Sequence, residues 1–438
     1  MTRVTKADWK TEPFSPNNIT ITLDRTFSNQ EVDLIKLGLI PEEMEDKWFI
    51  YWKDNRLYFH RSWTGIGIYI IHFDFRNDIY HMSSVEIDGE FYSNYNGAHE
   101  KLISSLIDNL MLIQNIEDIK INSENQDNVQ QEKRFIGALI GLAVGDAIGT
   151  TVEFARPGSF EPMTDMIGGG PYNLNAGEWT DDTAMALCLA ESLVLKGYDR
   201  TDQMERYCRW MDEGYMSSNG NCFDIGTTVA RALINYQHTG NPYSGPTEER
   251  TAGNGSLMRL VPIPMYFFNN PELAIEKAGD MSRTTHGAQE AIDACRYFTG
   301  LLIGALQGES KEVLLSKEYA PINHYWQNHK LSSSIRAIAN GSYKVKQPPE
   351  IIGSGYVVKS MEAALWAFCN SSSFEEGVLL AVNLGNDADT TAAIYGQLAG
   401  AYYGVDAIAE RWKGKIVKKS FIEELAIKLN KEGLTKGA

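Results

Sequence analysis

The first part of the chain alternates between apolar and polar residues in short runs. Residues 19–24 alternate with a period of two, which is typical of a half-buried strand. Asp54-Asn55 separates two aromatic, β-branched runs and suits a two-residue hairpin turn. Strands are predicted over residues 19–24, 47–53, 56–61, 65–75 and 79–88, and a helix over about 98–116. We therefore expect residues 1–120 to form a small α+β domain.

The pattern changes after this domain. Residues 121–133 are polar with few apolar positions, which predicts a linker. From residue 134 onward, apolar residues recur at helical spacing, strand patterns nearly vanish, and Gly, Ala and Ser recur within the helices. Small residues allow helices to approach closely, so we expect residues 134–438 to form a large all-α domain with its chemistry in the loops.

Composition excludes several classes of function. The chain has 438 residues and a formal charge of −17, and this charge argues against nucleic acid as a partner. The N-terminus has no hydrophobic signal-peptide core, and we expect no membrane-spanning stretch. The five cysteines are scattered without CxxC spacing, as in core thiols of a reducing compartment. A cytoplasmic location is the expectation.

Two acidic clusters carry the candidate chemistry. Thr180-Asp181-Asp182-Thr183 and Asp387-Ala388-Asp389-Thr390-Thr391 each stand beside the start of an alanine-rich apolar segment. Asp and Thr at such positions are ordinary N-caps, and capping alone is the simpler interpretation of either cluster. Carboxylates crowded together repel one another, however, and a divalent cation removes that repulsion. Ligand sets made only of oxygens suit Mg²⁺ or Mn²⁺, so two clusters brought together predict a metal-dependent hydrolase.

Further motifs surround these clusters. They are Gly141-Leu-Ala-Val-Gly-Asp146-Ala-Ile-Gly149 followed by Glu153, Gly168-Gly-Gly-Pro-Tyr172 leading to the first cluster, Gly220-Asn-Cys-Phe-Asp224-Ile-Gly226, and Gly253-Asn254-Gly255-Ser256-Leu-Met-Arg259. With the two clusters in order, the chain resembles the ADP-ribosylglycohydrolase family, which includes dinitrogenase-reductase-activating glycohydrolases and ADP-ribosylarginine hydrolases. The resemblance covers about residues 133–420 and implies an enzyme that removes ADP-ribose from arginine residues of proteins.

The resemblance also implies roles for individual residues. A binuclear Mg²⁺ centre, or one with Mn²⁺, would be held by Thr180, Asp181, Asp182, Asp387, Asp389 and Thr390. Catalytic carboxylates would be Asp181, Asp182, Glu153 and Asp224, with the choice of general base left open. Substrate would be bound by Gly168, Gly169, Gly170, Asn254, Gly255, Ser256 and His286.

The chemistry of N-glycosidic cleavage agrees with these roles. Positive charge develops at the anomeric carbon, and nearby carboxylates stabilise it. Backbone N–H groups of the Gly-Asn-Gly-Ser loop at residues 253–256 can cradle phosphate oxygens.

Simpler interpretations stand beside several assignments. Gly141, Gly145 and Gly149 run four apart, as expected of a helix-packing stripe. Asp146 can be a buried, hydrogen-bonded structural carboxylate. His286 can be structural, and Asn254-Gly255 can be an ordinary turn.

The α+β extension departs from the family's usual single domain. By architecture, the chain looks like immunity hydrolases paired with interbacterial ADP-ribosyltransferase toxins. This resemblance implies an enzyme that reverses the modification, or alternatively a stoichiometric inhibitor whose N-terminal region binds a cognate toxin and blocks its NAD site. An aromatic, acidic arm that includes Trp9 and Phe14 is one candidate for the toxin contact, and a poorly ordered terminus is the alternative.

Overall fold

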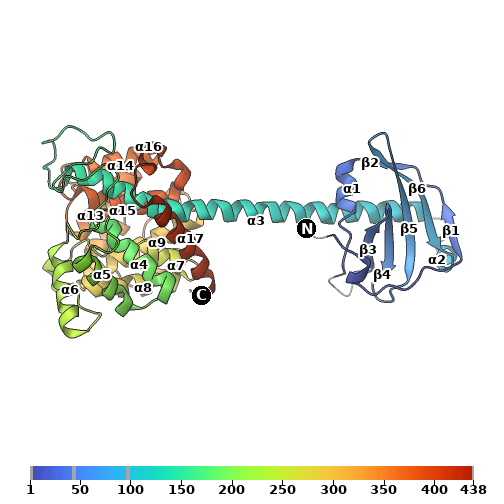
Figure 1. Cartoon of the computed structure of the whole chain (residues 1–438), viewed down its shortest axis with the longest axis horizontal. Coiled ribbons are helices and arrows are strands. Elements are labelled where there is room, and N and C mark those ends of the chain that lie inside the picture. Colours follow the sequence, from blue (N-terminus) through green and yellow to red (C-terminus); the bar gives the residue numbers. More distant parts are fainter. Residues whose placement is uncertain (1–2, 42–45, 95–98, 437–438) are drawn as a thin grey trace. The chain divides into compact units, whose positions relative to one another are not determined.

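The structure is a computed structural model and describes residues 3–41, 46–94 and 99–436. Contacts within the chain divide it into two compact units, residues 1–127 and 128–438. Unit 1 contains an antiparallel sheet, and unit 2 is helical (Figure 1). The predicted order, a small α+β region followed by a large all-α domain, is confirmed.

The sheet of unit 1 has the strand order β1-β6-β5-β4-β3, and the short strand β2 pairs with β6 beyond the end of β1. Its strands are β1 (Asn18–Ile21), β2 (Arg25–Phe27), β3 (Trp48–Lys53), β4 (Arg56–Arg61), β5 (Gly67–Arg76) and β6 (Ile79–Asp88). The predicted hairpin turn is present, because Asp54 and Asn55 both adopt positive φ angles, as a two-residue turn requires. The sequence prediction missed β2 because three residues are too few to show alternation.

Two layers cover the sheet. On one face, Leu57 and Phe59 pack against apolar residues of α3 such as Ile107 and of α1 (Asn29–Ile35), a helix that the prediction missed although Ser28 and Glu31 form its capping box. The short helix α2 (Gly89–Asn94) follows β6. Apolar contact with the helices therefore stabilises this face of the sheet.

The opposite face of the sheet is covered by the N-terminal segment. The Trp9 ring lies 6.4 Å from that of Phe49, and its Nε1 donates to the carbonyl of Ser62 at 2.8 Å. The Phe14 ring lies 4.9 Å from His60. These aromatic residues therefore pack on the chain's own sheet, and a role of this segment in toxin contact stays a prediction.

The segment predicted as a linker is helical. The helix predicted to end near residue 116 continues as α3 (His99–Gly149), so residues 121–133 lie within it. No Gly or Pro occurs between His99 and Ile136, so the stretch contains neither of the residues that most disfavour a helix. A linker can be helical, and the boundary between the two units falls within this range, so the role of residues 121–133 as a linker stays a prediction.

One stretch of α3 differs from the expectation about membranes. Residues Asn128–Val152 are long and apolar enough to cross a membrane by length and composition alone. In this structure, 89% of the apolar window is buried within the protein, as in the core helix of a folded domain. The apolar composition of this stretch is therefore explained by packing inside unit 2.

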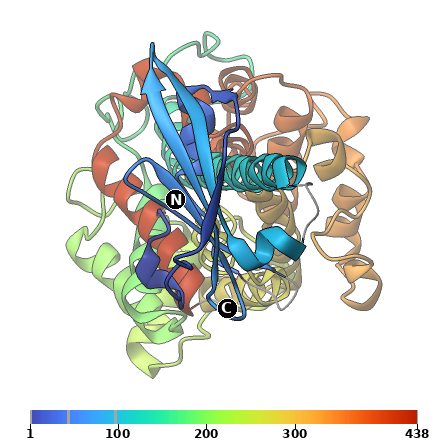
Figure 2. The same cartoon turned by 90° about the vertical axis from the view of Figure 1, so that its right-hand side faces the viewer.

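Unit 2 packs its helices around a single apolar core. Its helices from α4 to α17 are the ribbons coloured green to red in Figure 2. The longer helices are α4 (Asp181–Lys196), α5 (Arg200–Glu213), α6 (Thr227–Thr239), α8 (Pro271–Thr285), α9 (Gln289–Gln307), α13 (Val357–Cys369), α14 (Phe374–Val382), α15 (Ala388–Tyr403) and α17 (Lys419–Lys436). The shorter ones are α7 (Pro262–Tyr266), α10 (Lys311–Leu314), α11 (Tyr325–Asn328), α12 (Ser333–Ala339) and α16 (Glu410–Lys413).

A stripe of small residues brings the end of α3 against α15. A methyl group added to Gly145 would lie 2.1 Å from the carbonyl oxygen of Ala392, and one on Gly149 would lie 2.4 Å from the Cα of Asp389. The two backbones therefore touch with no room for side chains. The helix-packing interpretation of these glycines is confirmed, and the contact carries Asp146 to the start of α15.

Candidate active site

Asp146 on α3 holds the first acidic cluster in place. Its Oδ1 accepts hydrogen bonds from the N–H and the hydroxyl of Thr180 at 2.8 and 2.9 Å. Its Oδ2 accepts from the N–H and the hydroxyl of Thr183 at 3.0 and 2.6 Å. Four bonds to one buried carboxylate fix the first turn of α4, which supports the structural interpretation of Asp146.

Neither cluster caps its own helix. Thr180 is the N-cap residue of α4 and Asp387 that of α15, yet neither side chain makes a capping hydrogen bond. The capping interpretation is therefore wrong at both positions. The side chains of the clusters are directed instead toward one another: Thr390 Oγ1 donates to Asp182 Oδ2 at 3.3 Å across 208 positions of sequence.

The carboxylates form two overlapping triads. Asp146, Asp182 and Asp389 offer oxygens within 4.8 Å of one another, and so do Glu153, Asp387 and Asp389. The loop that follows Glu153 is joined to the second cluster, because the N–H of Phe154 donates to the carbonyl of Asn386 at 2.6 Å. The predicted meeting of the clusters is thus observed, with Asp389 common to both triads.

A cavity of about 550 Å³ opens beside the triads. Of the predicted residues, those that line it are Glu153, Asp181, Asp224, Asn254, Gly255, His286, Asp387, Asp389 and Thr390. Asp224 adopts a left-handed φ of 58° and accepts a hydrogen bond from the Tyr172 hydroxyl at 2.6 Å. Thr180 and Asp182 lie behind this wall, fully or almost fully buried.

The glycine-rich loop joins the second cluster through Asn254. Its Nδ2 donates to Asp387 Oδ2 at 2.6 Å, and its own N–H donates to the carbonyl of Gly355 at 3.0 Å. An ordinary turn does not require this side-chain contact with a buried carboxylate. Asn254 therefore orients a candidate ligand of the metal.

Four of the predicted substrate contacts are placed differently from the rest. Ser256 is buried and its hydroxyl pairs with that of Ser282 at 2.8 Å, so it does not line the cavity. Gly168, Gly169 and Gly170 all have positive φ and form a turn that is closed by the bridge between Gly169 and Leu174. In the described structure these three glycines do not line the cavity either. A substrate role for these four residues stays a prediction.

Burial and mutual repulsion shift the carboxyl groups strongly. Burial, then the charges of Asp224 and Asp387, raise the pKa of Glu153 to about 10. Burial raises the pKa of Asp224 to about 6, and that of Asp389 rises well above its usual range through burial and the neighbouring carboxylates. Without a cation, these carboxyl groups would therefore stay protonated to a higher pH than isolated carboxyl groups do.

The donor set fits divalent cations. Glu153 Oε2, Asp182 Oδ1 and Asp389 Oδ1 are buried and make no hydrogen bond to any described residue. Burying a carboxylate oxygen without a hydrogen-bond donor costs about 1–3 kcal/mol of folding free energy, and more when the group is charged. A bound cation would remove this cost. Carboxylate and hydroxyl oxygens bind hard cations, so the buried acidic clusters are consistent with metal binding.

Comparison with known proteins agrees with this geometry. The family model for ADP-ribosylglycohydrolase matches residues 127–438. The chain belongs to the ADP-ribosylglycohydrolase family. It is 42% identical over 294 residues to the ADP-ribosylarginine hydrolase Tri1 of Serratia proteamaculans (strain 568), covering 67% of this chain and 78% of that protein.

Other members of the ADP-ribosylglycohydrolase family extend this result. The ADP-ribosyl-[dinitrogen reductase] glycohydrolase of Rhodospirillum rubrum is 31% identical over 291 residues, covering 65% of this chain and 91% of that protein. A solved structure described as an ADP-ribosylglycohydrolase-related protein complex matches with a TM-score of 0.61 and 43% identity, covering 69% of this chain and 99% of that one.

Sequence reasoning overlooked several wall residues of this ADP-ribosylglycohydrolase site. Phe154 is 63% exposed at the cavity and adopts a left-handed φ of 59°, two features unfavourable for an aromatic residue. Thr227 and Thr228 start α6 at the same cavity. The Gly226-Thr227-Thr228 run after Asp224 is the sequence signal that could have indicated this helix start.

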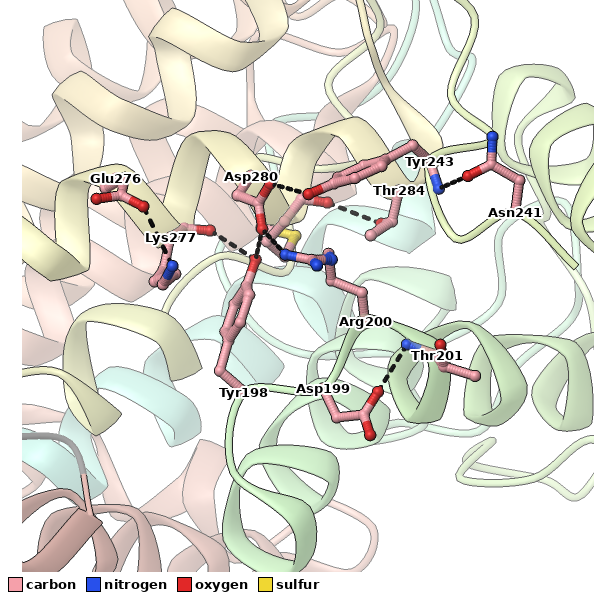
Figure 3. A network of polar contacts seen from close by, with 11 residues as sticks. Tyr198, Asp199, Arg200, Thr201, Asn241, Tyr243, Glu276, Lys277, Asp280 and Thr284 are labelled. Atoms are coloured by element: carbon pink, nitrogen blue, oxygen red, sulfur yellow. Dashed lines mark hydrogen bonds and ion pairs between the residues drawn. The ribbon is translucent and has the colours of Figure 1, made fainter.

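The helix that carries His286 is anchored away from the cavity. Asp280 of α8 accepts hydrogen bonds from the hydroxyls of Tyr198 and Tyr243 at 2.9 and 2.6 Å, and from Arg200 Nη1 at 2.7 Å (Figure 3). These contacts join α8 to the start of α5 and to the loop after α6. They fix the end of α8, where His286 follows as the C-cap residue.

Proposed function

We propose that the chain is a metal-dependent hydrolase that removes ADP-ribose from modified arginine residues of proteins. The observation that carries this proposal is the pair of carboxylate triads beside a cavity of about 550 Å³, with buried oxygens that lack donors. The relative named ADP-ribosylarginine hydrolase Tri1 supports the linkage to arginine, and the relative named ADP-ribosyl-[dinitrogen reductase] glycohydrolase supports an ADP-ribosylated protein as the substrate class.

The residues of the cavity suit N-glycosidic cleavage. The bond between the anomeric carbon and the guanidine nitrogen breaks with its electron pair on nitrogen, and Asp181, Glu153 and Asp224 stabilise the positive charge left on the ribose. One of these carboxylates takes a proton from the attacking water, and that proton ends on the departing guanidine, which restores arginine's cationic form. Tyr172 orients Asp224 for this work.

Two Mg²⁺ ions are the proposed cofactor, with Mn²⁺ as the alternative. The residues that would hold them are Thr180, Asp181, Asp182, Asp387, Asp389 and Thr390. When bound, these ions would supply positive charge for the ribose hydroxyls and for water. Their presence would also lower the pKa of the neighbouring carboxyl groups, so that the carboxylates are ionised at neutral pH.

The experiment is release of ADP-ribose from a protein ADP-ribosylated on arginine. Chelated protein should release none, and adding Mg²⁺ or Mn²⁺ should restore release. Asp181→Asn should abolish release with the metal present, while Asp199→Asn, a change at an exposed helix cap, should leave it unchanged. Full release in the presence of chelator would overturn the metal assignment, and release limited to another linkage would overturn the substrate.

A second candidate function is direct inhibition of an ADP-ribosyltransferase toxin by unit 1. Trp63 and Ile66 are 66% and 45% exposed at one hairpin of the sheet, and Phe75 and Ile79 are 49% and 43% exposed at another. Exposed apolar residues of this size often mark protein-binding surfaces. In this proposal the protein acts in the cytoplasm, where its scattered cysteines would remain reduced.

Inhibition and hydrolysis are separable by mutation. Trp63→Ser combined with Phe75→Ser should abolish binding to an arginine-specific ADP-ribosyltransferase, measured by calorimetry, and leave hydrolysis unchanged. Asp181→Asn should abolish hydrolysis and leave binding to the transferase unchanged. Unchanged affinity in the hairpin variant would remove these hairpins as the docking surface.

A further inference from the structure

A buried cation lies beneath the glycine-rich loop of the cavity. Arg259 is completely buried and makes no ion pair with any carboxylate in the part of the chain that the structure describes. Its Nη1 donates to the carbonyl of Gly255, and its Nε donates to the Tyr207 hydroxyl at 3.2 Å. Its Nη2 donates to Thr285 Oγ1 at 2.6 Å and, at the longer distance of 3.5 Å, to Thr284 Oγ1. Burying a charge without a counter-charge is unfavourable, so packing alone does not explain this arginine.

The contact with Thr285 determines the hydrogen-bonding state of His286. A guanidinium only donates, so it occupies one lone pair of Thr285 Oγ1. That hydroxyl also lies 2.9 Å from His286 Nδ1. Among the described residues, Nδ1 is the acceptor within reach of the hydroxyl proton. Nδ1 therefore accepts, and the proton of the neutral imidazole sits on Nε2.

Arg259 also opposes a second proton on this ring. Burial, together with the charge of Arg259, lowers the pKa of His286 to about 3. Protonation of Nδ1 would in addition end its role as acceptor of the Thr285 hydroxyl proton. The ring is thus neutral at physiological pH.

The Nε2 edge of His286 faces the cavity beside the loop. A methyl group added to Gly253 would lie 3.1 Å from Nε2, and one added to Gly255 would lie 2.7 Å from Cε1. His286 and both glycines line the cavity. The glycines are therefore required by the close approach of the ring, and the N–H on Nε2 is available at the wall.

Hydrogen bonds on the far side of the loop hold the same ring. The Ser256 hydroxyl pairs with that of Ser282 at 2.8 Å, and Ser282 Oγ donates to the carbonyl of His286 at 2.9 Å. The N–H of His286 donates to the carbonyl of Ser282 at 2.6 Å. Loop and histidine are thus connected both through Arg259 and through the two serines.

We propose that Arg259 is a positioning residue that, through Gly255 and Thr285, presents His286 to the cavity as a neutral Nε2–H donor for an oxygen of bound ADP-ribose. The inference rests on the proposed function for the identity of the ligand. The cavity wall is rich in carboxylates and contains no Lys or Arg among the described residues. A neutral donor can bind a ligand oxygen there without forming an ion pair with those carboxylates.

The tautomer is tested by nitrogen NMR of the full chain labelled with ¹⁵N-histidine. The His286→Gln spectrum identifies the signals of His286. We expect the Nε2–H tautomer in the unmodified protein and appearance of the Nδ1–H tautomer in Thr285→Val, which removes the hydroxyl but keeps the shape. Thr284→Val is the matched control: the Thr284 hydroxyl donates to the Met281 carbonyl at 2.7 Å and lies 3.5 Å from Arg259 Nη2, but among the described residues it makes no hydrogen bond to His286. An Nδ1–H signal in the unmodified protein, or no change in Thr285→Val, would overturn the proposal.

Binding is tested by calorimetry with ADP-ribose and Mg²⁺. Thr285→Val should weaken ADP-ribose binding about 3- to 10-fold, the effect of one hydrogen bond, and Thr284→Val by less than about twofold. Thr285→Ser keeps the hydroxyl and should therefore keep both the Nε2–H tautomer and the affinity. Arg259→Lys lacks the planar guanidinium that donates to both Gly255 and Thr285, and should lose both. Equal affinities in all variants would overturn the proposal. If the unmodified protein binds no ADP-ribose, the proposed function fails, and the NMR result still decides the tautomer.

Discussion

The amide of Asn254 donates to Asp387 Oδ2 at 2.6 Å, although the two residues are 133 positions apart in the sequence. Asn254 also donates to Ser360 Oγ at 3.1 Å. The loop beneath the cavity and the second acidic cluster are therefore one unit. A change in the loop should therefore alter the proposed metal site.

Asn254→Ala should weaken Mg²⁺ binding by about 10- to 100-fold, because hydrogen bonds of this kind orient a metal ligand. The measurement is the Mg²⁺ concentration that gives half-maximal release of ADP-ribose. Asn340→Ala is the control, since Asn340 donates to Glu318 at the surface. Equal Mg²⁺ dependence in both variants would show that Asn254 does not orient Asp387.

Asp146→Asn should destabilise unit 2. An amide has one acceptor oxygen, so the donors at Thr180 or Thr183 would face an NH₂ group in a fully buried site. We expect the free energy of unfolding to fall by roughly 2–5 kcal/mol, measured by urea denaturation followed by circular dichroism. Asp199→Asn, where both residue types cap a helix equally well, should change it little. A similar small change in Asp146→Asn would refute the structural role.

Gly145→Ala should separate α3 from α15. The added methyl group would meet the Ala392 carbonyl oxygen at 2.1 Å, and backbone atoms cannot yield as a flexible side chain can. A loss of about 1–3 kcal/mol or more is expected, together with weaker Mg²⁺ binding because Asp389 would move. Gly226→Ala, where nothing lies within 4 Å of the added methyl group, serves as the control for stability. Thermal unfolding of both variants distinguishes a packing contact from a general effect of alanine.

Chelated protein should become less stable as the pH rises. Burial raises the pKa of both Asp146 and Asp224 to about 6, above the unfolded value near 3.8. The folded state therefore binds more protons than the unfolded state between these values, and stability is lost as the pH rises from about 4 through 6. Differential scanning calorimetry in chelator should give a Tm that falls from pH 5 to pH 7.5.

Magnesium should reduce this loss of stability at higher pH, so the rise in Tm on adding Mg²⁺ should become larger as the pH increases. Asp224→Asn in chelator should show a shallower fall than the unmodified protein. A Tm that is constant or rises with pH in chelator would contradict the idea that these carboxyl groups are protonated without a cation.

Much of the fold could be predicted from local sequence. The hairpin at Asp54-Asn55 was predictable because few residue pairs accept two positive φ angles, and the surrounding strands show clear periodicity. The continuation of α3 through residues 121–133 was not, because this polar segment has few apolar residues that could show helical spacing. The three-residue strand β2 is held by β6 alone and has no pattern of its own.

The sequence by itself determined the ligand chemistry of the site: two clusters of carboxylates and hydroxyls at helix starts, together with a glycine stripe that permits close packing. Only the tertiary structure decided which oxygens face each other. It turned Ser256 away from the cavity, gave Asp146 four donors, and placed a buried Arg259 beneath His286. These outcomes depend on contacts between residues tens to hundreds of positions apart, and side-chain direction at such contacts is set by packing that no local pattern records.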